Sequence, residues 1–203
     1  PRPRRPCGIL GGWAPRPLAP RCGGAAGVAE GVAAVDGGGR VLRAGGVVTD
    51  PFVIEGPTIL NVSGGRTSAV MLRRYLDANG GALPSDCHAV FQNTGRERPE
   101  TLDFIHRCAT EWGVNIRWIE RCPTSKRGRD IRHVEVTYET ASRNSEPLDA
   151  VILAHNFLPH AMARSCTTDT KIAPARAFML AQGYTEWTSV VGLRFDEPGR
   201  VHR

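Results

Sequence analysis

The 203-residue sequence lacks several patterns that would place it in a class at once. No run approaches the ~20 consecutive apolar residues of a membrane span, which excludes an integral membrane protein. The six cysteines form no CxxC pair, which excludes a zinc ribbon and a thioredoxin-like motif. Their spacing is also too loose for a small disulfide-stapled secreted domain. Reduced and mostly buried thiols in a cytoplasmic protein are therefore expected.

Lysine is nearly absent, since only Lys126 and Lys171 occur among 26 basic residues, yet the net charge is +6. The charge is shared equally: residues 1–56 hold seven arginines against four acids, and the remainder holds nineteen bases against sixteen acids. The content of 41% hydrophobic and 23% charged residues is enough for a packed core. A mildly basic domain suits phosphate-bearing ligands without demanding nucleic acid.

The first fifty residues have little to bury, because they hold 12 of the 23 glycines and 6 of the 15 prolines. This composition predicts a disordered or misassigned leader over residues 1–56. An organelle transit peptide is the alternative, but such peptides are amphipathic and serine-rich rather than rich in proline and glycine.

From residue 57 onward, short apolar runs alternate with helical patterns. Residues 58–62, 88–92 and 114–119 are expected to be strands, and helices are expected after the first two. In the second helix, residues 98–112, the side chains at 102, 105, 109 and 112 should form one buried face. Later segments are assigned more coarsely: strands at 134–138 and 188–193, helices at 149–158 and 174–182, and an exposed loop at 121–132. The alternation predicts a doubly wound α/β domain with a mainly parallel sheet and helices on both faces.

The turn between the first strand and the first helix, Ser63–Ser68, carries the main chemical signal. Gly64 and Gly65 let backbone amides approach an anion, the helix N-terminus adds partial positive charge, and the hydroxyls add donors. An ordinary tight strand-to-helix connection is the alternative for so short a motif. The loop is neither GxxxxGK[ST] nor GxGxxG. A Ser-Gly-Gly-x-x-Ser turn after a strand instead resembles the PP-loop of adenine nucleotide alpha-hydrolase-like enzymes.

Five blocks in the family's order make the resemblance more specific, and the sequence is similar to the phage-type phosphoadenosine phosphosulfate reductase family over residues 57–203. The blocks are Asn61–Leu72, Phe91–Phe104, Ala141–Pro147, Arg164–Ile172 and Val191–Arg200. The resemblance implies a protein that binds an adenine nucleotide, phosphoadenylyl sulfate or ATP. As a reductase it would release sulfite with electrons from an external thiol protein.

The resemblance also implies roles for individual residues. Phosphates would lie on Ser63, Gly64, Gly65, Arg66, Thr67 and Ser68, and the turn Asn93, Thr94 and Gly95 would border the nucleotide pocket. Lys171, Arg194 and Arg200 match segments that contact substrate anions, which is consistent with the bidentate binding of phosphate and sulfate by arginine. The alternatives are a plain turn at Asn93–Gly95 and ordinary solvated cations.

Cys166 is the one candidate nucleophile, with a buried or pocket-lining thiol as the favoured alternative. An iron–sulfur cluster is disfavoured because Cys87, Cys108, Cys122 and Cys166 include no close pair. Asp196 and Glu197 are candidate Mg²⁺ ligands beside a triphosphate, or simply a polar loop. None of the six histidines is assigned to catalysis or to a metal.

Two departures from the family patterns keep other functions open. Thr67 stands where pyrophosphatase-type PP-loops often have Asp, and no Glu-Cys-Gly-x-His-like tail follows the last block, which suggests a C-terminally truncated domain. The alternatives to a reductase are an ATP alpha-hydrolase or sulfurtransferase that acts on nucleic acid, and an inactive nucleotide-binding remnant.

Overall fold

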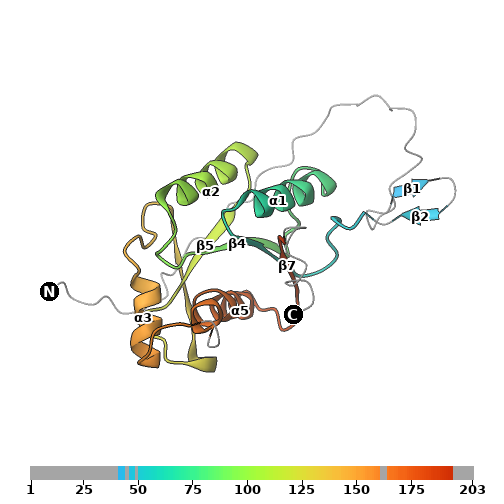
Figure 1. The fold of residues 1–203 in the computed structure, drawn as a ribbon. Helices are drawn as coiled ribbons and strands as arrows, with labels where there is room; N and C mark the ends of the chain where they lie inside the picture. Colours follow the sequence, from blue (N-terminus) through green and yellow to red (C-terminus); the bar gives the residue numbers. More distant parts are fainter. Residues whose placement is uncertain (1–40, 44–45, 49, 161–163, 194–203) are drawn as a thin grey trace. The chain divides into compact units, whose positions relative to one another are not determined.

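The computed structural model describes residues 41–43, 46–48, 50–160 and 164–193 (Figure 1). The chain divides into two compact units, Pro1–Asp50 and Pro51–Arg203. In the first unit, β1 (Val41–Arg43) and β2 (Gly46–Val48) form an antiparallel pair. The sequence predicted no element there, because two three-residue strands are too short to produce a periodic pattern.

Residues 51–56, which composition assigned to the leader, belong to the second unit. The ring of Phe52 meets the ring of Tyr75 edge-on at 5.2 Å between centroids. Asn79 also binds this segment, because its Oδ1 accepts a hydrogen bond from the Ile54 amide and its Nδ2 donates one to the Phe52 carbonyl. These contacts tie the segment to the end of the first helix of the domain.

A five-stranded sheet forms the centre of the second unit. Its strands are β3 (Thr58–Val62), β4 (Cys87–Gln92), β5 (Ile116–Arg121), β6 (His133–Val136) and β7 (Thr188–Val191). Their order is β6-β5-β4-β3-β7, and every pairing is parallel except that of β5 with β6. The predicted mainly parallel sheet is thus confirmed, and the antiparallel strand lies at one edge.

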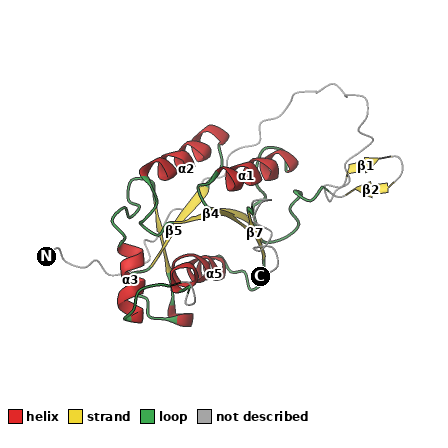
Figure 2. Ribbon diagram, in the orientation of Figure 1, coloured by secondary structure: helices red, strands yellow, loops and turns green. Residues whose placement is uncertain are grey.

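Helices cover both faces of this sheet (Figures 1 and 2). Helices α1 (Arg66–Ala78) and α2 (Pro99–Trp112) lie on one face, and α5 (Ala173–Ala181) lies on the other. Leu60, Leu72 and Leu102 belong to the core under α1 and α2, whereas Ile59 and Phe178 belong to the core under α5. The doubly wound α/β architecture is therefore confirmed.

The remaining elements connect β5 to β7. They are the 3₁₀ turn η1 (Gly128–Asp130), α3 (Glu146–His155), α4 (Ser165–Thr167) and the π-helical turn η2 (Thr168–Ile172). No helix among the described residues is long and apolar enough to cross a membrane.

The predicted details of two segments need correction. In α2 the buried side chains are Leu102, Ile105 and Cys108, and the predicted residues 109 and 112 pack against the same core but are half-buried. The assignment of residues 121–132 to an exposed loop was wrong in part, because Arg121 ends β5 and is fully buried, and Cys122, Ser125 and Ile131 are buried as well. A run rich in charged residues looks solvated in sequence, and the buried partners of Arg121 are not visible there.

Two half-buried histidines contact the core under α5, and we expect them to lower the stability of the domain in mild acid. His88 and His133 both pack edge-on against Phe178 at 5.5 Å, and burial lowers the pKa of each below its ordinary value. The unfolded chain therefore binds protons first, so stability should fall as the pH drops below about 6.5. Urea midpoints at pH 7.5 and 5.5 would measure this, and the fall should shrink in His88→Phe. If both His88→Phe and His133→Phe lost as much stability between these pH values as the unmodified protein, the explanation would be contradicted.

Candidate functional site

The carboxyl ends of the four parallel strands meet at one edge of the sheet, which we call the carboxyl edge. From β3 the chain moves to β4 and β5 in one direction, and β7 is then added on the other side of β3. The strand order thus reverses between β3 and β7. Open α/β sheets bind ligands in the crevice at such a point, outside the carboxyl ends of the strands.

The Ser63–Ser68 loop follows β3 directly and lies at this switch point. Ser68 is buried, and its Oγ donates to the Gly65 carbonyl at 2.9 Å. The same Oγ accepts from the amide and the hydroxyl of Ser63, each at 3.1 Å. Ser63, Gly65 and Arg66 are exposed. Ser68 therefore shapes the loop from inside, and the other three residues are the ones open to a ligand.

The first turn of α1 begins in this loop without a side-chain cap. Gly65 occupies the N-cap position in extended conformation, and no side-chain hydrogen bond satisfies the free amides. Gly192, immediately after β7, approaches so closely that a Cβ there would lie 3.2 Å from the amide nitrogen of Ser68. An uncapped helix start beside the end of a second strand is the arrangement that suits an anion.

The Asn93–Gly95 turn follows β4 and is tied to its neighbours through Asn93, which is fully buried. Its Nδ2 donates to Glu120 Oε1 at 2.6 Å and to the Ser142 carbonyl at 2.8 Å. Glu120, also buried, accepts from the amide and the hydroxyl of Ser142, each at 2.7 Å. Asn93 thus joins the ends of β4 and β5 to the segment before α3. Sequence reasoning missed Glu120, whose only signal was an acid next to an apolar strand.

The rest of this turn is held in the same way. Thr94 donates from its amide and its hydroxyl to the Glu97 carboxylate at 2.9–3.0 Å. The Gly95 carbonyl accepts from the amide of Ser145, which starts α3 with a positive φ of 72°. The structure therefore brings the Asn93–Gly95 turn to the carboxyl edge, next to the Ser63–Ser68 loop in strand order, but its polar groups are bonded within the protein.

A row of amide side chains crosses the sheet just inside the same edge. Asn61 Nδ2 donates to Ser189 Oγ at 3.1 Å and to the Val190 carbonyl at 2.9 Å. Its Oδ1 accepts from Gln92 Nε2 at 2.7 Å. Asn61 thereby links β4, β3 and β7 close to the carboxyl edge.

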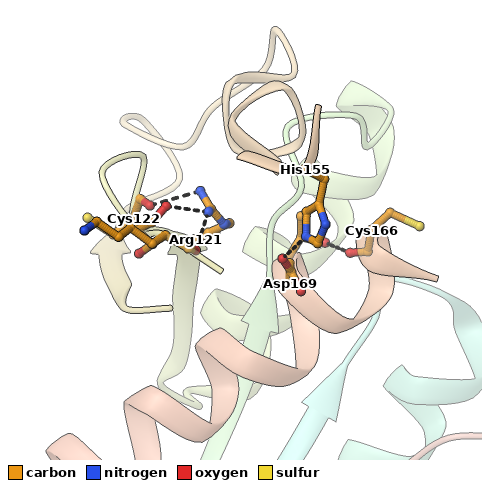
Figure 3. A network of polar contacts seen from close by, with 8 residues as sticks. Arg121, Cys122, His155, Cys166 and Asp169 are labelled. Atoms are coloured by element: carbon orange, nitrogen blue, oxygen red, sulfur yellow. Dashed lines mark hydrogen bonds and ion pairs between the residues drawn. The ribbon is translucent and has the colours of Figure 1, made fainter. Parts of the chain in front are cut away.

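The segment around Cys166 begins the long helix that leads into α5. Cys166 and Lys171 are both half-buried, and Figure 3 shows the Cys166 thiol pointing away from His155. His155 is therefore not placed to act as a base for the Cys166 thiol. Arg194, Arg200 and the candidate Mg²⁺ ligands Asp196 and Glu197 lie outside the described residues.

A buried charged network in this region was not anticipated from sequence (Figure 3). His155 Nε2 and Asp169 Oδ2 are 2.7 Å apart, with side chains only 16% and 7% exposed. Arg121 donates to the carbonyls of Cys122, Ser125 and Lys126. Burial lowers the pKa of Arg121 from its ordinary value and the Asp169 carboxylate raises it, but an arginine remains charged in this range. Sequence reasoning missed the pairing of His155 with Asp169, because the two residues lie on different helices and share no local motif.

The other described cysteines have no reactive character. Cys87, Cys108 and Cys122 are all buried thiols. Burial raises the pKa of Cys87 to about 12 and also raises that of Cys108, so both thiols stay protonated. Within the described ranges no three His, Cys, Asp or Glu side chains are grouped as metal ligands.

Among the described residues, cations with and without an acidic partner both occur, and several without one lie on the loops of the carboxyl edge. Arg73, Arg107 and Arg117, on the helices and mid-sheet, each pair with an acid. The loops after β3, β4 and β5 carry exposed cations for which the described part of the chain supplies no ion pair: Arg66, Arg96, Arg98, Lys126, Arg127 and Arg132. This edge is therefore suited to anionic ligands.

Comparison with known proteins agrees with this arrangement. The family model described as the phosphoadenosine phosphosulfate reductase domain matches residues 57–202. An uncharacterized nin region protein, ORF290, of Escherichia phage lambda is 25% identical over 150 residues, which are 70% of this chain and 50% of that protein. The chain thus spans about half the length of this curated relative. No solved structure gives a significant match. Since the family model covers well over half of the sequence, the chain belongs to the phosphoadenosine phosphosulfate reductase domain family.

Proposed function

We propose that this protein binds an adenine nucleotide in the crevice between β3 and β7 and reduces phosphoadenylyl sulfate to sulfite. The uncapped start of α1 at the switch point of the sheet is the observation that carries the proposal. Phosphates would lie on the exposed Ser63, Gly65 and Arg66 and on the first amides of the helix. Gly64, Thr67 and Ser68 would shape the loop around them.

The remaining site residues would have supporting roles. Asn93, Thr94 and Gly95 would form the wall of the nucleotide pocket after β4, and Lys171 would bind the sulfonate or a phosphate together with Arg194 and Arg200. An external dithiol protein would supply two electrons, the sulfur–oxygen bond to the phosphate would break, and adenosine 3′,5′-bisphosphate would leave. Cys166 stays a weaker candidate for contact with the sulfonate.

An ATP alpha-hydrolase or sulfurtransferase that acts on nucleic acid is the second candidate. The six exposed cations on three loops of the carboxyl edge favour it, because one nucleotide does not need so many. Strands about 4.8 Å apart spread these loops over a distance that suits several successive phosphates of a nucleic acid strand. The ligand would then be ATP with Mg²⁺, and pyrophosphate the product.

Replacing Gly65 by aspartate should abolish nucleotide binding and leave the fold intact. The site of a Cβ at Gly65 is open, its nearest neighbour being Ser63 Oγ at 3.7 Å, and aspartate is a favoured N-cap residue. Its carboxylate would, however, repel a phosphate from the cradle. The shift of melting temperature with phosphoadenylyl sulfate, ATP with Mg²⁺, or GTP measures binding, since a ligand at 100 times its Kd adds about 2.7 kcal/mol of stability.

Gly65→Asn is the matched control, because it keeps the size and the capping ability without the charge. Sulfite release from phosphoadenylyl sulfate would support the reductase, and pyrophosphate release from ATP the second candidate. Unchanged affinity in Gly65→Asp would remove the loop from the site. An unmodified protein that binds none of the three nucleotides would overturn both candidates.

A further inference from the structure

The helix that begins at Ser165 runs to Ala181 and contains the π-helical turn η2, Thr168–Ile172. Pro174 gives a local reason for the turn. An α-helix would use the amide of residue 174 as the donor to the Thr170 carbonyl, and proline has no N–H. Such turns are rare inside helices and are frequent at functional sites.

The turn changes which side chains of the helix are buried. The residue pairs 174–175 and 178–179 are buried, which is the four-residue spacing of an α-helix. Continued toward the N-terminus, this spacing would bury Thr170 and Lys171. Asp169 and Thr170 are buried instead, and Lys171 is half-buried at the surface. The extra residue of the π turn has therefore exchanged a buried lysine for a buried aspartate.

The charges around the turn favour this exchange. Asp169 lies 2.7 Å from His155, and its carboxylate is attracted by the charge of Arg121, which is fully buried. The charge of Arg121 would repel a lysine buried in that place, because like charges out of water repel strongly. On the other side of the turn, the Thr170 hydroxyl donates to the Cys166 carbonyl.

We propose that Asp169, oriented by His155, is a positioning residue for Lys171. The Asp169–His155 pair holds the π turn in its register, and the turn presents the Lys171 amine at the carboxyl edge for the sulfonate or phosphate of the nucleotide. The first half of this statement stands on the contacts described, and the second half rests on the proposed function.

Lysine labelling tests the first half without any ligand, because the chain has only two lysines. Trace acetylation of the full chain, read by mass spectrometry, gives the rate at Lys171 relative to the exposed Lys126. In the unmodified protein Lys171 should react more slowly than Lys126. His155→Ala and Asp169→Asn should release the turn, return Lys171 toward the buried α-helical register and lower the ratio severalfold.

Two further variants separate positioning from general damage. His155→Gln can still donate to Asp169 and should restore the ratio, and Asp149→Asn, an exposed acid on the same helix α3, should leave it unchanged. Should Asp169→Asn fail to fold, the two His155 variants decide the question. A ratio that does not change in His155→Ala would overturn the proposal.

Saturating phosphoadenylyl sulfate tests the second half in the same assay. It should protect Lys171 but not Lys126, and His155→Ala should need at least about tenfold more ligand, the weight of one charge-assisted hydrogen bond. If the ligand-free ratio changes in His155→Ala but phosphoadenylyl sulfate does not protect Lys171, Asp169 remains a positioning residue and the proposed function is overturned. If phosphoadenylyl sulfate protects Lys171 in the unmodified protein but the ligand-free ratio does not change in His155→Ala, the proposed function stands and Asp169 is not a positioning residue.

Discussion

Arg121→Ala is expected to destabilise the domain by about 3–5 kcal/mol, which is a large part of the stability of a typical domain. Arg121 is fully buried and bonds the carbonyls of Cys122, Ser125 and Lys126. Its removal would take the side-chain donor from these carbonyls, of which that of Cys122 keeps another donor, the Ser125 amide, and would remove a favourable charge acting on Asp169. The connection from β5 to β6 would lose its main internal support.

Urea unfolding of the variant would measure this effect as a lower midpoint with an unchanged slope. Arg107→Ala is the matched control, because Arg107 pairs with Glu111 on the surface of α2. Exposed pairs of that kind contribute only about 0.3–0.5 kcal/mol. If the two variants lost the same amount of stability, the buried bonds of Arg121 would contribute nothing.

Gly64→Ala should cost about 2–5 kcal/mol, the sum of left-handed backbone strain and overpacking. Gly64 has a φ of +74°, and a Cβ there would lie 2.3 Å from Thr101 Cγ2 and 3.0 Å from Ile105 Cδ1. Both atoms belong to α2, so the side chain would force α2 away from the loop. The cradle should lose its shape, and nucleotide binding should fall together with stability.

The neighbouring glycine provides the comparison for this prediction. Gly65 has an ordinary φ of −90° and open space around it, so Gly65→Ala should change stability by no more than about 1 kcal/mol. Thermal unfolding of the two variants side by side measures the difference. A Gly64→Ala variant as stable as Gly65→Ala would mean that α2 can move away from the loop without loss.

Much of the fold was predictable because its signals are local. The apolar runs at residues 58–62 and 88–92 and the helical period of residues 98–112 belong to single elements, and each element formed where predicted. The general behaviour of parallel sheets then places the loops after β3 and β4 at one edge. The amino-acid sequence alone is therefore enough to place the Ser63–Ser68 loop and the Asn93–Gly95 turn side by side.

The rest of the site depends on pairings between distant residues. Asn93 meets Glu120, and His155 meets Asp169, at separations of 27 and 14 positions in sequence. A buried charged residue such as Arg121 cannot be distinguished from an exposed one in the sequence, so only its partners in the structure reveal it. The π turn did leave a signal, Pro174 after a polar run, but its effect on Lys171 follows only from knowing which face of the helix is buried.

The bond between Asn61 and Ser189 joins residues 128 positions apart, and β7 follows the other described strands of the sheet in the chain. During synthesis the chain emerges N-terminus first, so β3 and its loop leave the ribosome long before β7 can pair with them. Until then β3 lacks its neighbour on that side. A nascent chain would therefore carry the Ser63–Ser68 loop early and complete the surroundings of the loop only after β7 has been made.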